Sequence, residues 1–225
     1  MAFRRTIRPP SRPAPDTLTR HMVGLGMNFA ARPLPDANIE DTLVFASEVG
    51  MLDHDLRVLG LLVQWIGVHH AHILADRLVR VIQDHEAPRV RSFWAGVAIW
   101  LDGDRRFARM KMFHQGPRVE LLPVGNAFQV ERRGEDPRFR EGPLIVPAGT
   151  LRECSADLLP PCELARRHAG YRNRVRMGPT WRANVWTVLE ADPDIRAAEA
   201  ARRAYCSFAT AWQTKQDFDL LRVAS

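Results

Sequence analysis

The chain lacks several features that would assign it to a class at once. Its 225 residues include only three cysteines, and no two of them form a CxxC pair. No apolar run approaches the roughly 18 residues that a membrane-spanning helix needs, and no apolar segment follows the basic N-terminus as it would in a secretory signal. We therefore expect a cytoplasmic protein with reduced thiols and no membrane contact.

Motifs of the common enzyme classes are also missing. The sequence contains no GxSxG, no P-loop, no GxGxxG after a predicted strand, and no kinase or nuclease signature. We therefore expect neither enzyme activity nor a cofactor.

One histidine-rich segment, VHHAHILAD, has spacings that zinc sites use. His69 and His72 lie three residues apart, and His72 and Asp76 lie four apart, so all three would share one helix face. No HExxH motif accompanies them, and histidines on a helix are more often surface or capping residues. A metal at this segment stays an open alternative, and no bound metal is predicted.

Two further sets of residues are weaker candidates for a metal. Cys154, Cys162 and His168 form a loose group whose spacing does not match a known metal-binding motif. Asp102 and Asp104 form a pair that would suit Mg²⁺, but Asp-Gly is first of all a turn signal. Neither set predicts a site.

Lysine is scarce, and this makes the basic character of the chain unusual. Only Lys111 and Lys215 among the 32 basic residues are lysines, the net charge is +6 and the isoelectric point is about 10.0. The planar fork of arginine suits phosphate and base recognition, although genomic codon bias would raise arginine everywhere as well.

The charge is distributed unevenly along the chain. Residues 39–85 carry seven acidic and three basic side chains, a net of −4. Residues 164–189 carry six arginines and no carboxylate, and the first twenty residues carry five arginines and one aspartate. Such asymmetry is typical of a protein that binds a polyanion with one end.

The apolar pattern predicts a mainly α protein in four regions. Residues 1–36, rich in arginine and proline, should be a flexible basic arm. Residues 37–103 predict an N-terminal helical domain of four helices, and residues 104–162 a short β-containing connector in which FARMKMF, RVELLPV and part of NAFQVERR alternate like strands. Residues 163–225 predict a C-terminal tri-helical helix-turn-helix domain.

The stretch ARRAYCSFATAW, which ends at Trp212, predicts two helices joined by a tight turn. The first helix should end near Ala204, and Ser207 is a good N-cap for the second because its hydroxyl accepts a free backbone N–H. Small Ala201 and Ala211 would allow the two helices to approach closely. A plain corner between packed helices is the structural alternative.

This stretch, extended to ARRAYCSFATAWQTKQDF, resembles the helix-turn-helix of bacterial transcription regulators over Val185–Leu220. It departs from them at Tyr205, where glycine is common, and because tyrosine tolerates positive φ poorly we expect a longer or differently shaped turn. The resemblance implies that the protein binds double-stranded DNA with its second helix in the major groove.

The wider chain is similar to antitoxin-like regulators that bacteria encode beside nucleotidyltransferase-type toxins. The features that carry this likeness are YRNRVRMGPTWRANV before the helix-turn-helix and the separate helical domain. The likeness implies a repressor or autoregulating antitoxin that binds its own promoter with one end, and a partner protein or a second copy with the other.

The helix-turn-helix interpretation of the C-terminal region predicts two sets of DNA-binding residues. The first set would face the bases and consists of Ser207, Phe208, Ala209, Trp212, Gln213 and Gln216. Glutamine amides suit adenine, and apolar side chains suit the methyl group of thymine. Residues that would contact phosphates are Arg172, Arg174, Arg176, Arg182, Arg203 and Lys215.

A homodimer is the natural expectation, because one unit of this kind binds DNA weakly, and the N-terminal helices would form its interface. The alternative function is a protein-interaction module whose acidic N-terminal helices hold a basic partner without any DNA binding.

Overall fold

The computed structural model describes residues 11–34 and 37–223, and it is mainly helical, as the sequence predicts. In this part of the chain the sheet consists of two short parallel strands, β1 (Val119–Glu120) and β2 (Leu144–Ile145). The first group of helices comprises α1 (Pro15–Gly24), α2 (Ile39–Leu52), α3 (Leu56–His69), η1 (His70–His72), α4 (Ala75–Gln83), α5 (Pro88–Trp100), η2 (Arg105–Phe113) and α6 (Asn126–Arg133). The later helices are η3 (Ser155–Asp157), α7 (Pro161–Arg167), α8 (Ala169–Met177), α9 (Trp181–Ala191), α10 (Ala197–Arg203) and α11 (Phe208–Val223).

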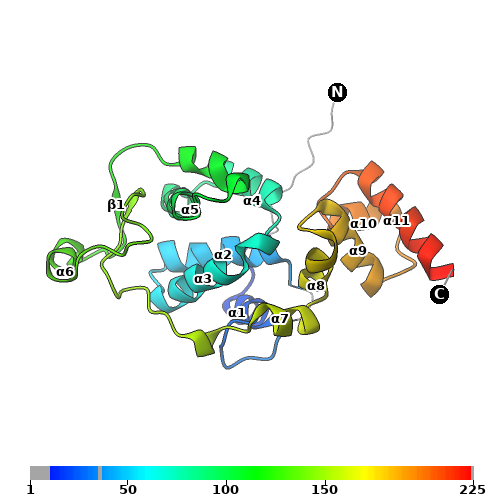
Figure 1. The fold of residues 1–225 in the computed structure, drawn as a ribbon, viewed down its shortest axis with the longest axis horizontal. Coiled ribbons are helices and arrows are strands. Elements are labelled where there is room, and N and C mark those ends of the chain that lie inside the picture. Colours follow the sequence, from blue (N-terminus) through cyan, green and yellow to red (C-terminus); the bar gives the residue numbers. More distant parts are fainter. Residues whose placement is uncertain (1–10, 35–36, 224–225) are drawn as a thin grey trace.

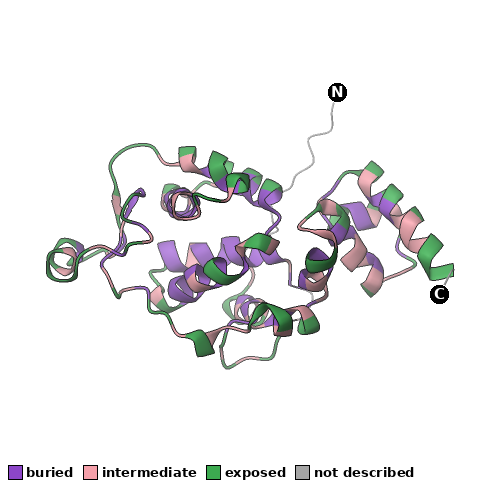
Figure 2. Ribbon diagram, viewed as in Figure 1, coloured by how far each residue is buried: buried purple, intermediate pink, exposed green. Residues whose placement is uncertain are grey.

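The larger of two hydrophobic cores forms around α2, which is buried on almost all sides (Figure 2). A helix that is buried on nearly every face needs neighbours on all sides, and α1, α3, α4 and α5 supply them. Trp65 of α3 and Trp94 of α5 are fully buried in this core, and the Trp94 Nε1–H donates to Ser47 Oγ at 3.0 Å. We call this part of the protein, residues 11–34 and 37–177, the main body.

The flexible arm predicted over residues 1–36 is wrong for its second half. Residues 15–24 form α1, and Leu18 and Met22 are buried in the main core. The Trp65 Nε1–H donates to the Leu25 carbonyl at 2.9 Å, which fixes the end of α1. Proline suits the first helical turn, because its missing N–H would be unpaired there anyway. The proline-rich composition of this segment is therefore compatible with a helix that begins at Pro15. Residues 1–10 and 35–36 of the predicted arm lie outside the described residues.

The region predicted as a β-containing connector, residues 104–162, has less strand than expected. FARMKMF lies in the 3₁₀ helix η2 and NAFQVERR forms α6, whereas RVELLPV and LIVPAGTL contain β1 and β2. The side chains of Phe107, Leu121, Phe139 and Val146 are buried in the same core as α2 and α3. The region therefore packs as a layer of the main body rather than as an exposed link.

The second core lies in the C-terminal helices α9, α10 and α11, which we call the tri-helical unit. Val185 and Leu189 of α9, Ala200 and Ala201 of α10, and Ala211 of α11 are fully buried within it. Small residues at the α10–α11 contact let the two helices lie close together, as the sequence predicts. Figure 1 shows the unit at one end of the molecule, with α11 on its outer side and α8 between it and α2.

Candidate nucleic-acid interface

The turn between α10 and α11 is compact. The Cys206 N–H donates to the Ala201 carbonyl at 3.0 Å, and the Tyr205 N–H donates to the Arg202 carbonyl at 3.2 Å. This pair of bonds is the Schellman pattern that ends many helices with one left-handed residue. That residue is Tyr205, with φ of 56°. The expectation of a longer or differently shaped turn is wrong, because tyrosine occupies the position that usually carries glycine.

Contacts with the main body explain how a tyrosine occupies this position. The Tyr205 hydroxyl donates to Asp41 Oδ2 at 2.9 Å, and the Arg77 guanidinium lies 3.9 Å from the centre of the Tyr205 ring. Left-handed backbone costs a residue with a Cβ roughly 1–2 kcal/mol, which a hydrogen bond and a cation–π contact offset. Burial, and then the Asp41 carboxylate, raise the pKa of Tyr205, so the hydroxyl stays protonated and remains a donor.

The second helix of the pair, α11, begins as predicted. Ser207 Oγ accepts the Thr210 N–H at 3.1 Å, and the Ser207 carbonyl accepts the Ala211 N–H. The inner face of α11 is held by Ala211 and Thr214, which are buried. The start and the rotation of the helix are thereby fixed.

The outer face of α11 carries the residues that the sequence predicts as base-reading. Phe208 and Trp212 are 50% and 48% exposed, one turn apart, and face away from the second core. All six predicted residues are exposed: Ser207, Phe208, Ala209, Trp212, Gln213 and Gln216. Gln213 Nε2 makes one long contact, 3.4 Å to Asp217 Oδ1, so its amide is nearly free to bind elsewhere.

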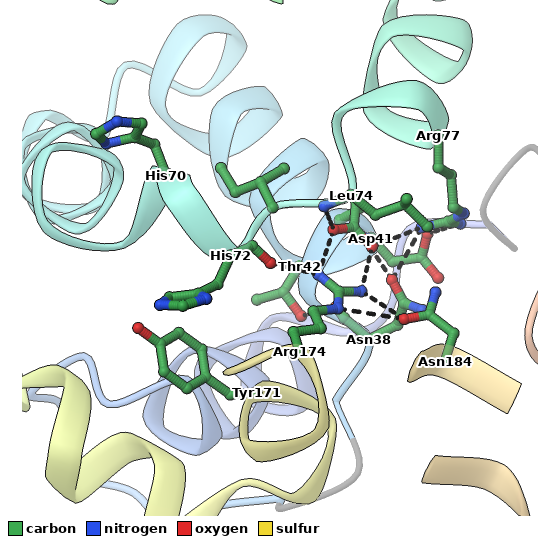
Figure 3. Close-up of polar contacts among 12 residues, drawn as sticks. Asn38, Asp41, Thr42, His70, His72, Leu74, Arg77, Tyr171, Arg174 and Asn184 are labelled. Atoms are coloured by element: carbon green, nitrogen blue, oxygen red, sulfur yellow. Dashed lines mark hydrogen bonds and ion pairs between the residues drawn. The ribbon is translucent and has the colours of Figure 1, made fainter. Parts of the chain in front are cut away.

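Arg174, one of the predicted phosphate ligands, lies on α8 and is buried where the main body meets α9. Its Nη1 and Nη2 bind the two carboxylate oxygens of Glu40 at 2.6 and 2.8 Å. Its Nη2 and Nε also donate to Asn184 Oδ1 at 2.8 and 3.2 Å, and its Nη1 to the His72 carbonyl at 3.0 Å (Figure 3). The prediction for Arg174 is wrong, because the side chain is used inside the protein and cannot reach a phosphate.

A cluster of four buried charges surrounds Arg174, consisting of Glu40, Asp41, Arg77 and Arg174. Arg77 Nη2 pairs with Asp41, and Arg77 Nη1 lies 3.7 Å from Glu40 Oε2. Burial alone would raise the pKa of Glu40, but Arg174 and Arg77 hold that pKa below its ordinary value. Burial dominates at Asp41 and raises its pKa. The cluster joins α2, α4 and α8, and through Tyr205 it reaches the turn of the tri-helical unit.

The other predicted phosphate ligands lie at the surface, and four of them are paired with carboxylates. Arg172 pairs with Glu190 at 3.2 Å, Arg182 with Asp217 at 2.7 Å, Arg203 with Glu199 at 3.0 Å, and Lys215 with Asp219 at 3.2 Å. Arg176 is exposed and has no partner among the described residues. Exposed ion pairs contribute little to stability, so Arg182 and Arg203 can exchange partners. Arg172 and Lys215 are only partly exposed, and Lys215 Nζ also donates to the Pro193 carbonyl at 3.0 Å.

Residues 164–189, the arginine-rich segment, contain no carboxylate of their own, but in the folded protein carboxylates from elsewhere in the chain lie beside them. Glu40, Glu190 and Asp217, which lie outside residues 164–189, supply partners for three of its arginines. Residues 178–225 contain six basic and six acidic side chains, so this part of the chain has no net charge. The uninterrupted run of positive charge therefore does not form an equally positive surface.

The histidine segment does not assemble into a site. His69 is buried with its Nδ1 2.9 Å from the Tyr171 hydroxyl, whereas His72 packs against the Tyr171 ring and Asp76 pairs with Arg80. Burial lowers the pKa of His69 to about 4, which keeps the ring neutral. Within residues 11–34 and 37–223 no three His, Cys, Asp or Glu side chains are grouped to hold a metal ion.

The two weaker candidate sets also serve local structure. His168 caps α8, where its Nδ1 accepts the Tyr171 N–H at 3.0 Å, while Cys154 and Cys162 are free thiols. Asp104 caps η2 and pairs with Arg106 at 2.5 Å, and Asp102 pairs with Lys111.

The residues that position the turn could not be recognised from the sequence. Asp41 and Arg77 lie far from Tyr205 in the sequence, and no pattern connects the three. The one available signal was Tyr205 itself, since a tyrosine in a glycine position needs an external contact to hold it there.

Comparison with known proteins finds no matching family model, no matching curated protein and no matching solved structure. Among the described residues, no helix combines the length and the apolar character that crossing a bilayer would require.

Proposed function

We propose that this protein binds double-stranded DNA in a sequence-dependent manner and acts as a transcriptional regulator. One observation carries the proposal: α11 starts at a tight left-handed turn, is anchored by Ala211 and Thr214, and presents all six predicted base-facing residues to solvent. A helix held in this way by a preceding short helix has the form of the second helix of a helix-turn-helix, which enters the major groove with its N-terminal part.

The chemistry of the exposed face fits base edges. The Gln213 and Gln216 amides would pair with adenine, which offers a donor and an acceptor side by side. Ala209 and Phe208 would contact thymine methyl groups. The N-terminus of α11 carries the positive end of the helix dipole, which favours an approach to phosphate.

Phosphate contacts would come from the five predicted residues that remain at the surface: Arg172, Arg176, Arg182, Arg203 and Lys215. Only Arg176 is without a carboxylate partner among the described residues. DNA would have to displace Glu190, Asp217, Glu199 or Asp219 from the others. We therefore expect moderate affinity for one copy, and a homodimer that contacts two half-sites would supply the rest.

A second candidate function, protein binding without DNA, is favoured by exposed apolar residues near the end of α11. Leu220, Leu221 and Val223 are all exposed there. The acidic helices give this function less support than the sequence suggests, because Glu40 and Asp41 are held inside the protein by arginines.

The test is fluorescence anisotropy with two duplexes, one from the DNA upstream of the gene and one scrambled, at about 50 and 200 mM salt, where phosphate contacts are visible. Replacing both Gln213 and Gln216 by Ala should cost roughly 1–3 kcal/mol per lost base contact on the preferred duplex and leave the scrambled duplex unchanged. The matched control is Gln115→Ala, an exposed glutamine in the main body.

Three results are informative. Equal weakening on both duplexes would mean that the glutamines do not read bases. Equal affinity of the unaltered protein for both duplexes would leave only general attraction to a polyanion. No binding at the lower salt would contradict DNA binding and favour the protein-binding function.

A further inference from the structure

A cleft of about 490 Å³ opens where the tri-helical unit meets the main body. Its walls come from the start of α2, from α8 and α9, and from the end of α10. Small apolar residues make up much of its lining, namely Ala37, Ala169, Gly170, Ala191 and Ala204. The volume lies within the range of small-molecule sites, roughly 300–1,000 Å³, and such sites favour junctions between separately packed parts of a protein.

Three guanidinium groups line this cleft, and those of Arg172 and Arg203 have hydrogen-bonding capacity to spare, whereas that of Arg174 is used on Glu40 and Asn184. Arg172 uses one Nη2–H on Glu190, at 3.2 Å, and Arg203 uses its Nε–H on Glu199, at 3.0 Å, while its Nη1 lies 3.9 Å from Asp192 Oδ2. A guanidinium has five N–H groups, so both side chains keep donors for a ligand. The one carboxylate in the lining, Glu190, is already bonded to Arg172 and Asn173.

The third donor is the amide nitrogen of Asn184, which has no partner within the described part of the protein. Asn184 lines the cleft and is only 8% exposed. Its Oδ1 accepts two N–H groups from Arg174, which fixes the orientation of the amide. Its Nδ2 has no hydrogen-bond partner among the described residues. A buried donor without a partner is costly. Because Asn184 Nδ2 has almost no accessible surface, a carboxylate in the cleft would bind it only after a small movement of the lining, and the bond would remove that cost.

We propose that this cleft binds a small carboxylate with an apolar body. The carboxylate would accept from Asn184 and from Arg172 or Arg203, and the apolar body would lie on the alanine-rich lining. A singly charged group suits the cleft better than a phosphate dianion, because Glu190 would repel the second charge. The proposal does not rest on DNA binding, although Arg172 and Arg203, which line the cleft, are also named above as phosphate contacts.

The experiment measures binding of benzoate and 2-naphthoate to the full chain by ligand-observed NMR and calorimetry, with benzamide and 2-naphthamide as neutral counterparts. Two variants test the donors. Arg172→Gln removes a charged donor, and Asn184→Asp keeps an acceptor for Arg174 while replacing the free donor by a negative charge. The matched control is Arg176→Gln, since Arg176 lies on α8 but is not among the residues that line the cleft.

We expect a carboxylate to bind the unaltered protein and the Arg176→Gln control equally. Binding should be at least about tenfold weaker in the two test variants, because each loses a charge-assisted hydrogen bond, and the amides should bind more weakly than their acids. Thermal unfolding of each variant verifies that it is folded. Equal binding of acid and amide, unchanged affinity in folded test variants, or no binding of either carboxylate would overturn the proposal.

Discussion

At the scale of single residues, two arginines on one helix have opposite environments. Arg174 is buried and holds Glu40 with both of its terminal nitrogens, whereas Arg176, two residues later, is exposed. Nothing in the local sequence RNRVRM separates them, and the sequence predicts phosphate contacts for both. A helix places residues two apart on different faces, and the face of α8 that carries Arg174 packs against Glu40 of α2.

Replacing Arg174 by Met should lower the free energy of unfolding by about 3 kcal/mol or more, because Glu40 would lose its main partner and stay buried. The control, Arg176→Gln, should change it by no more than about 0.5 kcal/mol, as is usual for an exposed residue. Urea unfolding followed by tryptophan fluorescence measures both. Similar values for the two variants would show that the Glu40–Arg174 pair does not stabilise the protein.

At the scale of elements, the α10–α11 pair combines local signals with one distant support. Ser207 caps α11, and the Schellman bonds end α10, both within a few residues of sequence. The left-handed tyrosine between them depends on Asp41 and Arg77 from the main body. The turn therefore sets the angle between two helices and also attaches the tri-helical unit to its neighbour.

Loss of the α11 N-cap should lower the free energy of unfolding, and a substitute capping side chain should restore it. Ser207→Ala should destabilise the protein by about 1 kcal/mol, because the Thr210 N–H loses its acceptor. Ser207→Asn, which keeps a side-chain acceptor, should restore most of that stability. Thermal unfolding of the full chain compares the three proteins, and equal stability of the Ala and Asn variants would argue against a capping role.

At the scale of the whole molecule, the main body and the tri-helical unit have separate cores joined by charged and polar contacts. The buried cluster of Glu40, Asp41, Arg77 and Arg174 lies at this junction, as does the cleft proposed to hold a carboxylate. His69 and Tyr171 lie nearby in the main core, joined by a contact of 2.9 Å. Because buried polar groups need their partners, protonation changes in this region should alter the stability of the protein.

The shifted pKa of His69 predicts the direction in which stability changes with pH. Its pKa is near 6.5 in an unfolded chain and falls to about 4 in the fold because of burial. Between these values the unfolded state binds the extra proton, so the stability contributed by neutral His69 is complete above about pH 6.5 and is lost as the pH falls towards 4.

The variant His69→Gln should therefore show a smaller loss of stability between pH 6.5 and pH 4 than the unaltered protein. The control is His54→Asn, since His54 is exposed with φ of 57°, a conformation that asparagine tolerates. Urea unfolding at a series of pH values measures the slope. The same slope for His69→Gln and the unaltered protein would mean that His69 is not the group responsible.

The sequence by itself determined the α class, the position of the tight turn, the Ser207 cap and the exposed face of α11. These features depend on neighbours within about four residues, where helical periodicity and capping chemistry act. Only the tertiary structure decided that Arg174 is internal, that α1 belongs to the core, and that a tyrosine occupies the left-handed position. The partners responsible lie far away in sequence, 134 residues for Arg174 and Glu40 and 164 for Tyr205 and Asp41. Such pairs form only when chain topology brings two elements together and burial makes an unpaired charge too costly to leave.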